Sequence, residues 1–119
     1  VTSSFHGNRT FNNYGYSIYA GTKAGLTAFA KAAALELAKY KIRVNVVAPG
    51  AIESHLNDDL QRTERLKEVA IPVEYPEGKY PFGIGTAEQV ADLVLFLSSP
   101  QADYISGTEV YIDGVRSLI

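Results

Sequence analysis

The chain has 119 residues and a formal net charge of −2, with 11 Lys and Arg against 13 Asp and Glu, and 46% of its residues are apolar. This composition is typical of a globular domain and excludes a disordered or fibrous chain. The weak charge gives no electrostatic footprint for nucleic acid or anionic lipid, and no apolar stretch approaches the roughly 18 residues of a membrane span. With no Cys and two His, the sequence offers no disulfide, no thiolate nucleophile and no histidine-rich metal site.

The first residues indicate that the chain is part of a longer protein. It begins with Val rather than Met, and residues 1–4, Val-Thr-Ser-Ser, read as the end of a strand that is already under way. Residues 5–17 then contain many Gly, Asn and Tyr without a clear period, which predicts a loop.

A long helix is predicted from about Ser17 to Tyr40. Ala, Leu, Lys and Glu dominate this segment, it contains no Pro, and its apolar residues recur at helical spacing. Those residues are Leu26, Phe29, Ala30, Ala33, Ala34 and Leu37. The small side chains favour close packing against another helix or a sheet, although Ala is also simply the best helix former.

A strand is predicted over 42–48, directly after the helix. Apolar residues occupy every second position from Ile42 to Ala48, which is typical of strands, and Pro49 with Gly50 ends the run. A helix, a very short connection, a strand and a break at its carboxyl end indicate an α/β organisation. Asn45 lies inside the predicted strand, and we interpret it as structural.

The segment 54–85 differs from its surroundings. Charged residues dominate positions 58–68 and predict a short, solvated helix, whereas three Pro and three Gly between positions 72 and 85 exclude regular structure. A segment of this length and irregularity inside a compact domain is usually a lid or a binding loop. The alternative is a solvent-exposed surface loop that has no role in binding.

A second helix and a last strand complete the predicted elements. Thr86 and Gln89 have the spacing of a capping box, in which each side chain bonds the main chain of the other residue. The helix that follows is expected to bury its apolar residues, Val90, Ala91, Leu93, Val94, Phe96 and Leu97. Residues 98–100, Ser-Ser-Pro, end this helix, and the last strand alternates around Val110 and Ile112.

The candidate active site is the pattern Tyr-x-x-x-Lys formed by Tyr19 and Lys23. Residues four apart lie on one face of a helix, so the phenol and the ammonium can address one ligand. An unperturbed tyrosine titrates near pH 10, whereas a general acid or base works best near the operating pH. A nearby cation favours the phenolate by about 3–4 kcal/mol, which is comparable to that gap. The spacing therefore predicts a tyrosine that exchanges protons.

A second match to this pattern runs from Tyr75 to Lys79 and contains Pro76 and Gly78. Pro76 and Gly78 both disfavour a helix, so this Tyr and this Lys need not share a face. We therefore place the site at the first match.

The sequence around the first match resembles the short-chain dehydrogenase/reductase family. The resemblance rests on Ser-Ser-Phe-His-Gly at 3–7, Ile-Arg-Val-Asn-Val-Val-Ala-Pro-Gly at 42–50 and Thr-Glu-Val-Tyr-Ile-Asp-Gly at 108–114, in the right order. It spans essentially the whole chain. It implies an α/β fold, the C-terminal part of a Rossmann-like doubly wound parallel sheet. Residues 1–119 would then form the C-terminal half of a single domain, without the N-terminal dinucleotide-binding half.

The resemblance assigns three catalytic roles. Tyr19 is similar to the catalytic acid/base of the family, and Lys23 to the residue that promotes its ionisation and holds the ribose hydroxyls of the nicotinamide nucleotide. Ser4 fits the family's Ser-x-x-Gly pattern and is similar to the serine that orients the substrate oxygen. It precedes Tyr19 by 15 positions, about two more than is usual in the family, so either the loop bulges or Ser3 takes this role.

The residues after the first predicted strand resemble the nicotinamide-binding segment of the family. They are Pro49, Gly50, Ile52 and Ser54; Ile52 would meet the carboxamide through its main chain, and Ser54 stands where Thr is more usual. Ligands of α/β sheets bind beyond the carboxyl ends of the strands, which agrees with this location, although Pro-Gly can also be only a turn. The implied cofactor is NAD or NADP, held in part by the Tyr-Lys pair.

Several parts of the family have no counterpart in this sequence. The only Gly-x-Gly, at 83–85, has no strand before it and has Glu88 where a third glycine would stand, so it is not a phosphate-binding turn. The glycine cluster, the residue that selects NAD or NADP and the family's catalytic Asn belong to the absent half.

Other polar residues near the proposed site are weaker candidates. Phe5 and His6 are the candidate substrate contacts because they lie beside the proposed serine. Asn12 and Asn13 belong to the same loop, where Asn more often makes turns. His55 is expected to be exposed and not catalytic.

These observations predict an NAD(P)-dependent oxidoreductase that transfers hydride between nicotinamide and an alcohol or ketone, with Tyr19 as the proton donor or acceptor. The resemblance also implies a homodimer or homotetramer built through the Ala-rich helix, the last helix and the last strand. The N-terminal half is an expected partner, without which the chain is expected to be inactive, and no nucleic acid or membrane is expected. With no targeting signal in the sequence, we expect the cytoplasm.

Two alternatives stay open at this point. A nucleotide-sugar epimerase or dehydratase shares Tyr-x-x-x-Lys, but such relatives have a larger C-terminal substrate region than the few residues that follow Gly114 here. A catalytically silent binding or scaffold protein is the other alternative, against which the intact Ser4, Tyr19 and Lys23 argue.

Overall fold

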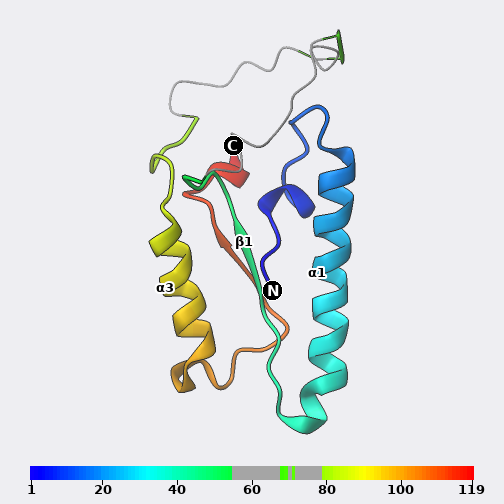
Figure 1. Cartoon of the computed structure of the whole chain (residues 1–119), viewed down its shortest axis with the longest axis vertical. Helices are drawn as coiled ribbons and strands as arrows, with labels where there is room; N and C mark the ends of the chain where they lie inside the picture. The colour runs from blue at the N-terminus through cyan, green and yellow to red at the C-terminus, as the bar shows by residue number, and fades with distance from the viewer. Residues whose placement is uncertain (55–67, 70, 72–78) are drawn as a thin grey trace.

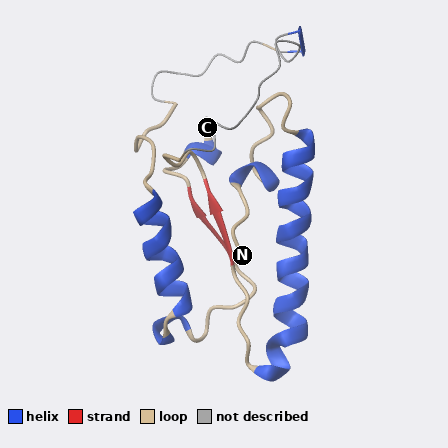
Figure 2. Cartoon of the chain, in the orientation of Figure 1, coloured by secondary structure: helices blue, strands red, loops and turns tan. Residues whose placement is uncertain are grey.

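The computed structural model describes residues 1–54, 68–69, 71 and 79–119 (Figure 1). Figure 2 shows helices and strands in the same orientation. The longer elements are α1 (Ser17–Leu37), β1 (Val46–Pro49), α3 (Ala87–Ser98) and β2 (Glu109–Ile112). Short 3-10 turns accompany them in the described ranges, among them η1 (Phe5–Gly7), η2 (Ala38–Tyr40), η4 (Pro100–Ala102) and η5 (Arg116–Leu118).

The sheet is parallel and centred on β1. This strand pairs with β2 in a parallel register in which Val46 lies opposite Glu109, and the N-terminal segment lies along its other edge. Val47 makes the bonds to that segment, since its N–H donates to Val1 O at 2.9 Å and its carbonyl accepts from Ser3 N at 2.8 Å. The strands lie between α1 and α3 (Figure 1). This arrangement confirms the predicted α/β organisation.

The Ala-rich helix forms where its periodicity predicts it. α1 covers the predicted segment up to Leu37, and the remaining predicted residues form the tighter turn η2. Its buried residues are Thr27, Ala30 and Ala34. The small side chains on this stripe bring the helix close to η1 and β1, which is what positions its first turn at the end of the sheet.

The predicted strand over 42–48 is wrong at its start, because β1 begins only at Val46. Before that residue, hydrogen bonds of the Asn45 side chain stand where paired strands would have main-chain hydrogen bonds. Its Nδ2 donates to Ile105 O at 2.8 Å, and its Oδ1 accepts from Thr108 N at 3.3 Å. Asn45 therefore lies just before the strand and not inside it, and its structural role is confirmed.

The capping box of α3 is confirmed, whereas the predicted buried face is wrong for most of its residues. Thr86 Oγ1 accepts from Gln89 N at 3.3 Å, and Gln89 Oε1 accepts from Thr86 N at 2.9 Å. Leu97 is the one buried residue of this helix in the described part of the chain, and Val94 and Phe96 are 42% and 46% exposed. Apolar spacing indicates a face that packs against a partner, and none of the described elements covers this one.

The ends of the irregular segment 54–85 meet beside the sheet. Ile52 and Gly85 form a parallel bridge, in which Gly85 N donates to Ala51 O at 2.9 Å and Glu53 N donates to Gly85 O at 2.8 Å. The predicted helix over 58–68 lies outside the described residues except for its last one. His55, Tyr75 and most of the predicted lid also lie outside them, so the lid stays a prediction.

Candidate active site

A cavity of about 500 Å³ lies beyond the carboxyl end of β1, and we refer to it as the Tyr19 cavity. Its walls come from η1, the first turn of α1, the residues that follow β1 and the C-terminal turn. The described residues that line it are Ser4, Phe5, His6, Asn13, Gly15, Tyr16, Tyr19, Gly50, Ala51, Ile52, Lys79, Tyr80 and Arg116. The fold therefore brings together candidate residues from three separate segments of the sequence.

The first turns of α1 hold Tyr19 and Lys23 on one side of the helix, as the four-residue spacing predicts. Lys23 Nζ lies 5.8 Å from the centroid of the Tyr19 ring. It donates to Thr2 O at 3.2 Å, which ties the ammonium to the N-terminal segment of the sheet. Tyr19 lines the cavity, and Lys23 is not among the described lining residues. The phenol therefore faces the cavity with a cation beside its ring.

The structure distinguishes Ser4 from Ser3. The Ser3 hydroxyl donates to Lys23 O at 3.0 Å and accepts from Thr27 Oγ1 at 2.8 Å, so both of its interactions are directed at α1. Ser4 lines the cavity, and its Oγ accepts from His6 N at 3.2 Å as the cap of η1. The hydroxyl proton of Ser4 stays available to a ligand, because a serine hydroxyl can donate while it accepts.

The long loop between Ser4 and Tyr19 is held by His6. Since a carbonyl can only accept, His6 Nδ1 donates to Thr10 O at 3.0 Å, and His6 Nε2 accepts from Asn13 Nδ2 at 3.1 Å. Burial lowers the pKa of His6 below its ordinary value; the Thr10 carbonyl opposes this effect and the charge of Arg116 adds to it. His6 is thus a neutral imidazole that supports the loop from inside through both of its ring nitrogens.

A row of aromatic rings leads from this histidine to the candidate catalytic residue. The His6 ring lies 5.2 Å from the Tyr16 ring, and Tyr16 meets Tyr19 edge to face at 5.4 Å, both measured between centroids. Edge-to-face pairs at this distance are favourable for aromatic rings. Packing of this kind fixes the direction of the Tyr19 side chain.

The predicted nicotinamide segment lies partly in the cavity. Gly50 and Ile52 line it, Pro49 ends β1, and the exposed Ser54 is not among its described lining residues. The bridge to Gly85 uses main-chain groups of the residues on either side of Ile52, so it leaves the N–H and C=O of Ile52 itself to other partners. A glycine is required at position 50, because a Cβ there would lie 2.6 Å from Asp113 Cβ.

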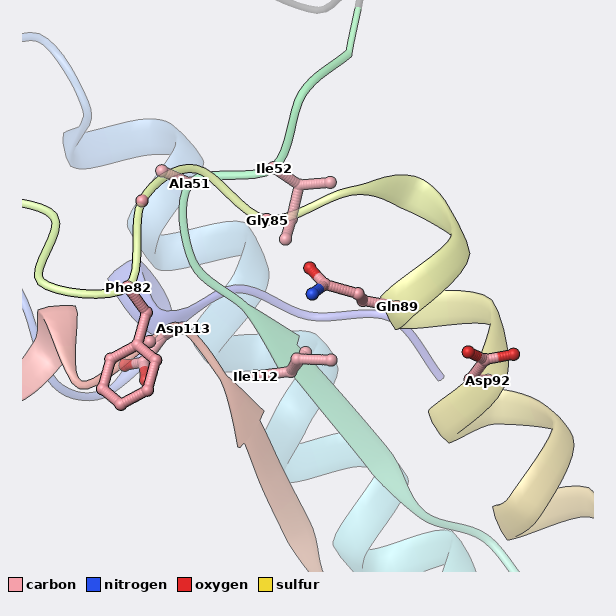
Figure 3. Close-up of a pocket in the computed structure, with 10 residues that line it drawn as sticks. Ala51, Ile52, Phe82, Gly85, Gln89, Asp92, Ile112 and Asp113 are labelled. Carbon is pink, nitrogen blue, oxygen red and sulfur yellow. The ribbon is translucent and has the colours of Figure 1, made fainter.

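A second cavity of about 400 Å³ shares Ala51 and Ile52 as a wall with the first (Figure 3). Figure 3 shows the Gln89 amide directed at Ile52 and Gly85, and the Phe82 ring beside Asp113. The Gln89 oxygen is already used by the capping box. This second space has no Tyr-Lys pair on its described walls, so the candidate chemistry lies in the Tyr19 cavity.

Sequence reasoning missed several residues of the cavity wall, among them Tyr16, Tyr80 and Arg116. Tyr16 had a usable signal, since it lies one helical turn before Tyr19. Arg116 had no signal in the sequence, because it reaches the cavity only when the end of β2 lies beside β1.

Among the described residues no group of three or more His, Asp or Glu is placed to hold a metal ion, and no described helix has the length and apolarity to traverse a bilayer.

Comparison with known proteins places the chain in a family. A family model described as enoyl-(acyl carrier protein) reductase matches residues 1–114. The chain is 39% identical over 105 residues to the 3-oxoacyl-(acyl-carrier-protein) reductase FabG of Salmonella typhimurium, and this match covers 88% of the chain and 40% of that protein.

Solved structures agree with that assignment. A 3-ketoacyl-ACP reductase from Sinorhizobium meliloti is similar with a TM-score of 0.89 and 44% identity, over 99% of the chain and 47% of that structure. A 3-ketoacyl-(acyl-carrier-protein) reductase from Brucella melitensis, complexed with NADH, is similar with a TM-score of 0.76 and 30% identity, over 98% of the chain and 42% of that structure. The chain spans less than half the length of these relatives. It belongs to the enoyl-(acyl carrier protein) reductase family and corresponds to the C-terminal part of a Rossmann-like short-chain dehydrogenase/reductase domain.

Proposed function

We propose that the chain supplies the proton-transfer and substrate-binding half of an NAD(P)-dependent oxidoreductase that acts on an alcohol or a ketone. One observation carries this proposal: Ser4 and Tyr19 line the same cavity, beyond the carboxyl end of β1, with the Lys23 ammonium beside the Tyr19 ring. Parallel α/β sheets bind ligands at this end of their strands. The similar reductase from Brucella melitensis, whose structure holds NADH, supports a nicotinamide cofactor.

The residues after β1 fit a nicotinamide ring. Gly50 and Ile52 line the cavity, and the main chain of Ile52 can offer an N–H and a C=O to a carboxamide, which needs one acceptor and one donor. When bound, the nicotinamide supplies or accepts the hydride. The chain's own residues then have two tasks, to position the reacting oxygen and to move a proton.

Ser4 and Tyr19 divide these tasks. The Ser4 hydroxyl donates to the carbonyl or alcohol oxygen of the substrate, since its proton remains available while its oxygen accepts from His6 N. In reduction, the Tyr19 hydroxyl gives its proton to the substrate oxygen as hydride reaches the carbon, and a phenolate is left. In oxidation, the phenolate takes the proton of the alcohol.

Lys23 stabilises the charge that this transfer creates. The ammonium lies 5.8 Å from the centroid of the Tyr19 ring. Its bond to Thr2 O keeps it at this position.

We infer that the glycine-rich phosphate site is supplied by an N-terminal half, and that the complete enzyme is a homodimer or homotetramer. The apolar faces of the two helices support both inferences. On α1, Ile18, Phe29 and Leu35 are 82%, 68% and 81% exposed, and on α3 Leu95 is 71% exposed. Apolar surfaces of this kind usually mark a contact with another protein surface.

The proposal is tested by nicotinamide oxidation in the complete enzyme across a panel of aldehydes and ketones. We expect Ser4→Ala to lower kcat by about 10²-fold, the usual effect of losing one donor to a reacting oxygen. Ser4→Thr keeps the hydroxyl and should retain most of the activity.

Ser3→Ala is the matched control, because the Ser3 hydroxyl bonds α1 and not the cavity. We expect this variant to lower the unfolding midpoint with a far smaller effect on kcat. Equal kcat values for Ser4→Ala and the unmodified enzyme would contradict the assigned role, and an enzyme that oxidises neither NADH nor NADPH with any carbonyl would contradict the proposed function.

A further inference from the structure

An amide oxygen that the described part of the fold does not use belongs to the wall of the Tyr19 cavity. It is Oδ1 of Asn13, a partly buried residue of the loop between η1 and α1 that lines the cavity together with Ser4 and Tyr19. Asn13 Nδ2 donates to His6 Nε2 at 3.1 Å, whereas no group of the described residues is bonded to Asn13 Oδ1. Because an amide oxygen has two acceptor lone pairs, Asn13 brings an acceptor to the cavity.

The direction of the Asn13 amide is set by His6. The Thr10 carbonyl can only accept, so His6 Nδ1 carries the proton of the ring, and burial lowers the pKa of His6 and keeps the ring neutral. His6 Nε2 therefore presents a lone pair, which only a donor can meet. The NH2 group of Asn13 must face His6, and the amide oxygen of Asn13 must face away from it, because the opposite orientation would place two acceptors against each other.

His6 also links this acceptor to the candidate catalytic serine. Its main-chain N–H donates to Ser4 Oγ at 3.2 Å, while its ring bonds Thr10 and Asn13. The residue is buried, and its ring packs 5.2 Å from the Tyr16 ring between centroids. Both ring nitrogens are occupied, so the His6 side chain has no hydrogen bond left for a substrate. The polar groups that remain for one are those of Ser4 and Asn13, which this buried residue holds in a fixed relation.

We propose that Asn13 determines substrate specificity, and that its Oδ1 accepts a hydrogen bond from the substrate while the reacting oxygen meets Ser4 and Tyr19. The substrate is then a ketone, or the corresponding alcohol, that carries a hydroxyl or an amide N–H a few bonds from the reacting carbon. A simple aliphatic ketone would cover the amide oxygen without bonding it, and a polar group covered in this way costs free energy. This inference rests on the proposed function and narrows its substrate class.

Two matched pairs of ketones test the acceptor in the complete enzyme. N-methyl-3-oxobutanamide carries an N–H that N,N-dimethyl-3-oxobutanamide lacks, and 4-hydroxy-2-butanone carries an O–H that 4-methoxy-2-butanone lacks. The donor atom is equally far from the reacting carbon in both pairs, so the pairs separate an amide donor from a hydroxyl donor. For at least one pair we expect kcat/KM of the unmodified enzyme to be about 5–10-fold higher for the donor than for its methylated partner, the usual scale of one neutral hydrogen bond.

Two substitutions separate an acceptor for the substrate from a support for the loop. Asn13→Leu replaces the amide with an apolar group of similar size and should abolish the preference, chiefly by raising KM for the donor substrate. Asn13→Asp loses the donor toward His6 but keeps an acceptor, so it should lower kcat for both members of a pair and retain the preference. If Asn13 only supported the loop, both variants would lower kcat/KM equally for the donor and for the methylated substrate.

Asn12 provides the matched control. It directly precedes Asn13, is not among the described lining residues of the cavity, and has a buried Oδ1 without a hydrogen-bond partner among the described residues. Asn12→Leu makes the same chemical change outside the cavity, so the preference should be unchanged. The unfolding midpoint should not fall either, because the substitution removes a buried polar atom that is unpaired.

A binding measurement accompanies the kinetics. In the presence of the oxidised cofactor, with which a ketone cannot react, the donor member of the preferred pair should raise the melting temperature of the unmodified enzyme more than its methylated partner does. Asn13→Leu should abolish this difference, because a ligand stabilises only the state that binds it.

Two results would overturn the inference. They are an unmodified enzyme that prefers the donor in neither pair, and an equal loss of kcat/KM for the donor and the methylated substrate in Asn13→Leu. In each case nicotinamide is still oxidised, so the proposed function stands. Failure of every carbonyl substrate instead contradicts the proposed function itself.

Discussion

Tyr19→Phe is expected to lower kcat of the complete enzyme by about 10²–10⁴-fold, the usual contribution of a positioned general acid or base. The substitution removes the hydroxyl and keeps the ring that packs edge to face against Tyr16. The unfolding midpoint should therefore change little. The measurements are single-turnover rates of nicotinamide oxidation at saturating cofactor and the unfolding midpoint.

The matched control for this substitution is Tyr104→Phe. Tyr104 is fully exposed, so loss of its hydroxyl should leave both the rate and the stability unchanged. Retention of a normal single-turnover rate in Tyr19→Phe would show that another group transfers the proton, and the mechanism proposed for Ser4, Tyr19 and Lys23 would then be wrong.

Gly50→Ala is expected to destabilise the protein by about 1–3 kcal/mol or more, the usual cost of forcing an extra carbon into a packed site. The added Cβ would lie 2.6 Å from Asp113 Cβ and 2.7 Å from Asp113 Cα, so the main chain at the end of β2 has to move. Because Asp113 closes the C-terminal turn, and this turn reaches the wall of the Tyr19 cavity through Arg116, this movement should also raise KM for the carbonyl substrate. Urea denaturation and KM for that substrate measure the two effects.

A second glycine provides the comparison. A Cβ on Gly25, in α1, meets no described atom within 4 Å, and Ala is the better helix former by about 1 kcal/mol. Gly25→Ala should therefore not lower the urea midpoint. A Gly50→Ala protein with the midpoint of the unmodified one would contradict the close approach of the two strand ends.

Local patterns in the sequence predicted the local structure well. The spacing of Tyr19 and Lys23, the periodicity of α1 and the capping box of α3 depend on residues within a few positions of one another, and all three are found in the structure. The start of β1 could not be predicted in this way, because Asn45 is bonded to Ile105 and Thr108, about 60 positions away.

The same limit explains which parts of the candidate site were missed. Ser4 and Ile52 were predicted because each belongs to a recognisable segment, and the choice of Ser4 over Ser3 required the contacts of Ser3 with α1. Arg116 lies in no motif. It lines the cavity only because the pairing of β1 with β2 brings the C-terminal turn beside η1.

The left-handed conformation of Val115 makes the C-terminal turn a place where heat resistance and the order of the cavity wall compete. Glycine or asparagine adopts this conformation more readily than valine, so either would relax the main chain. The relaxed turn would also hold Arg116, which lines the cavity, less firmly. Selection for thermal tolerance and selection for turnover would therefore favour different residues at this one position.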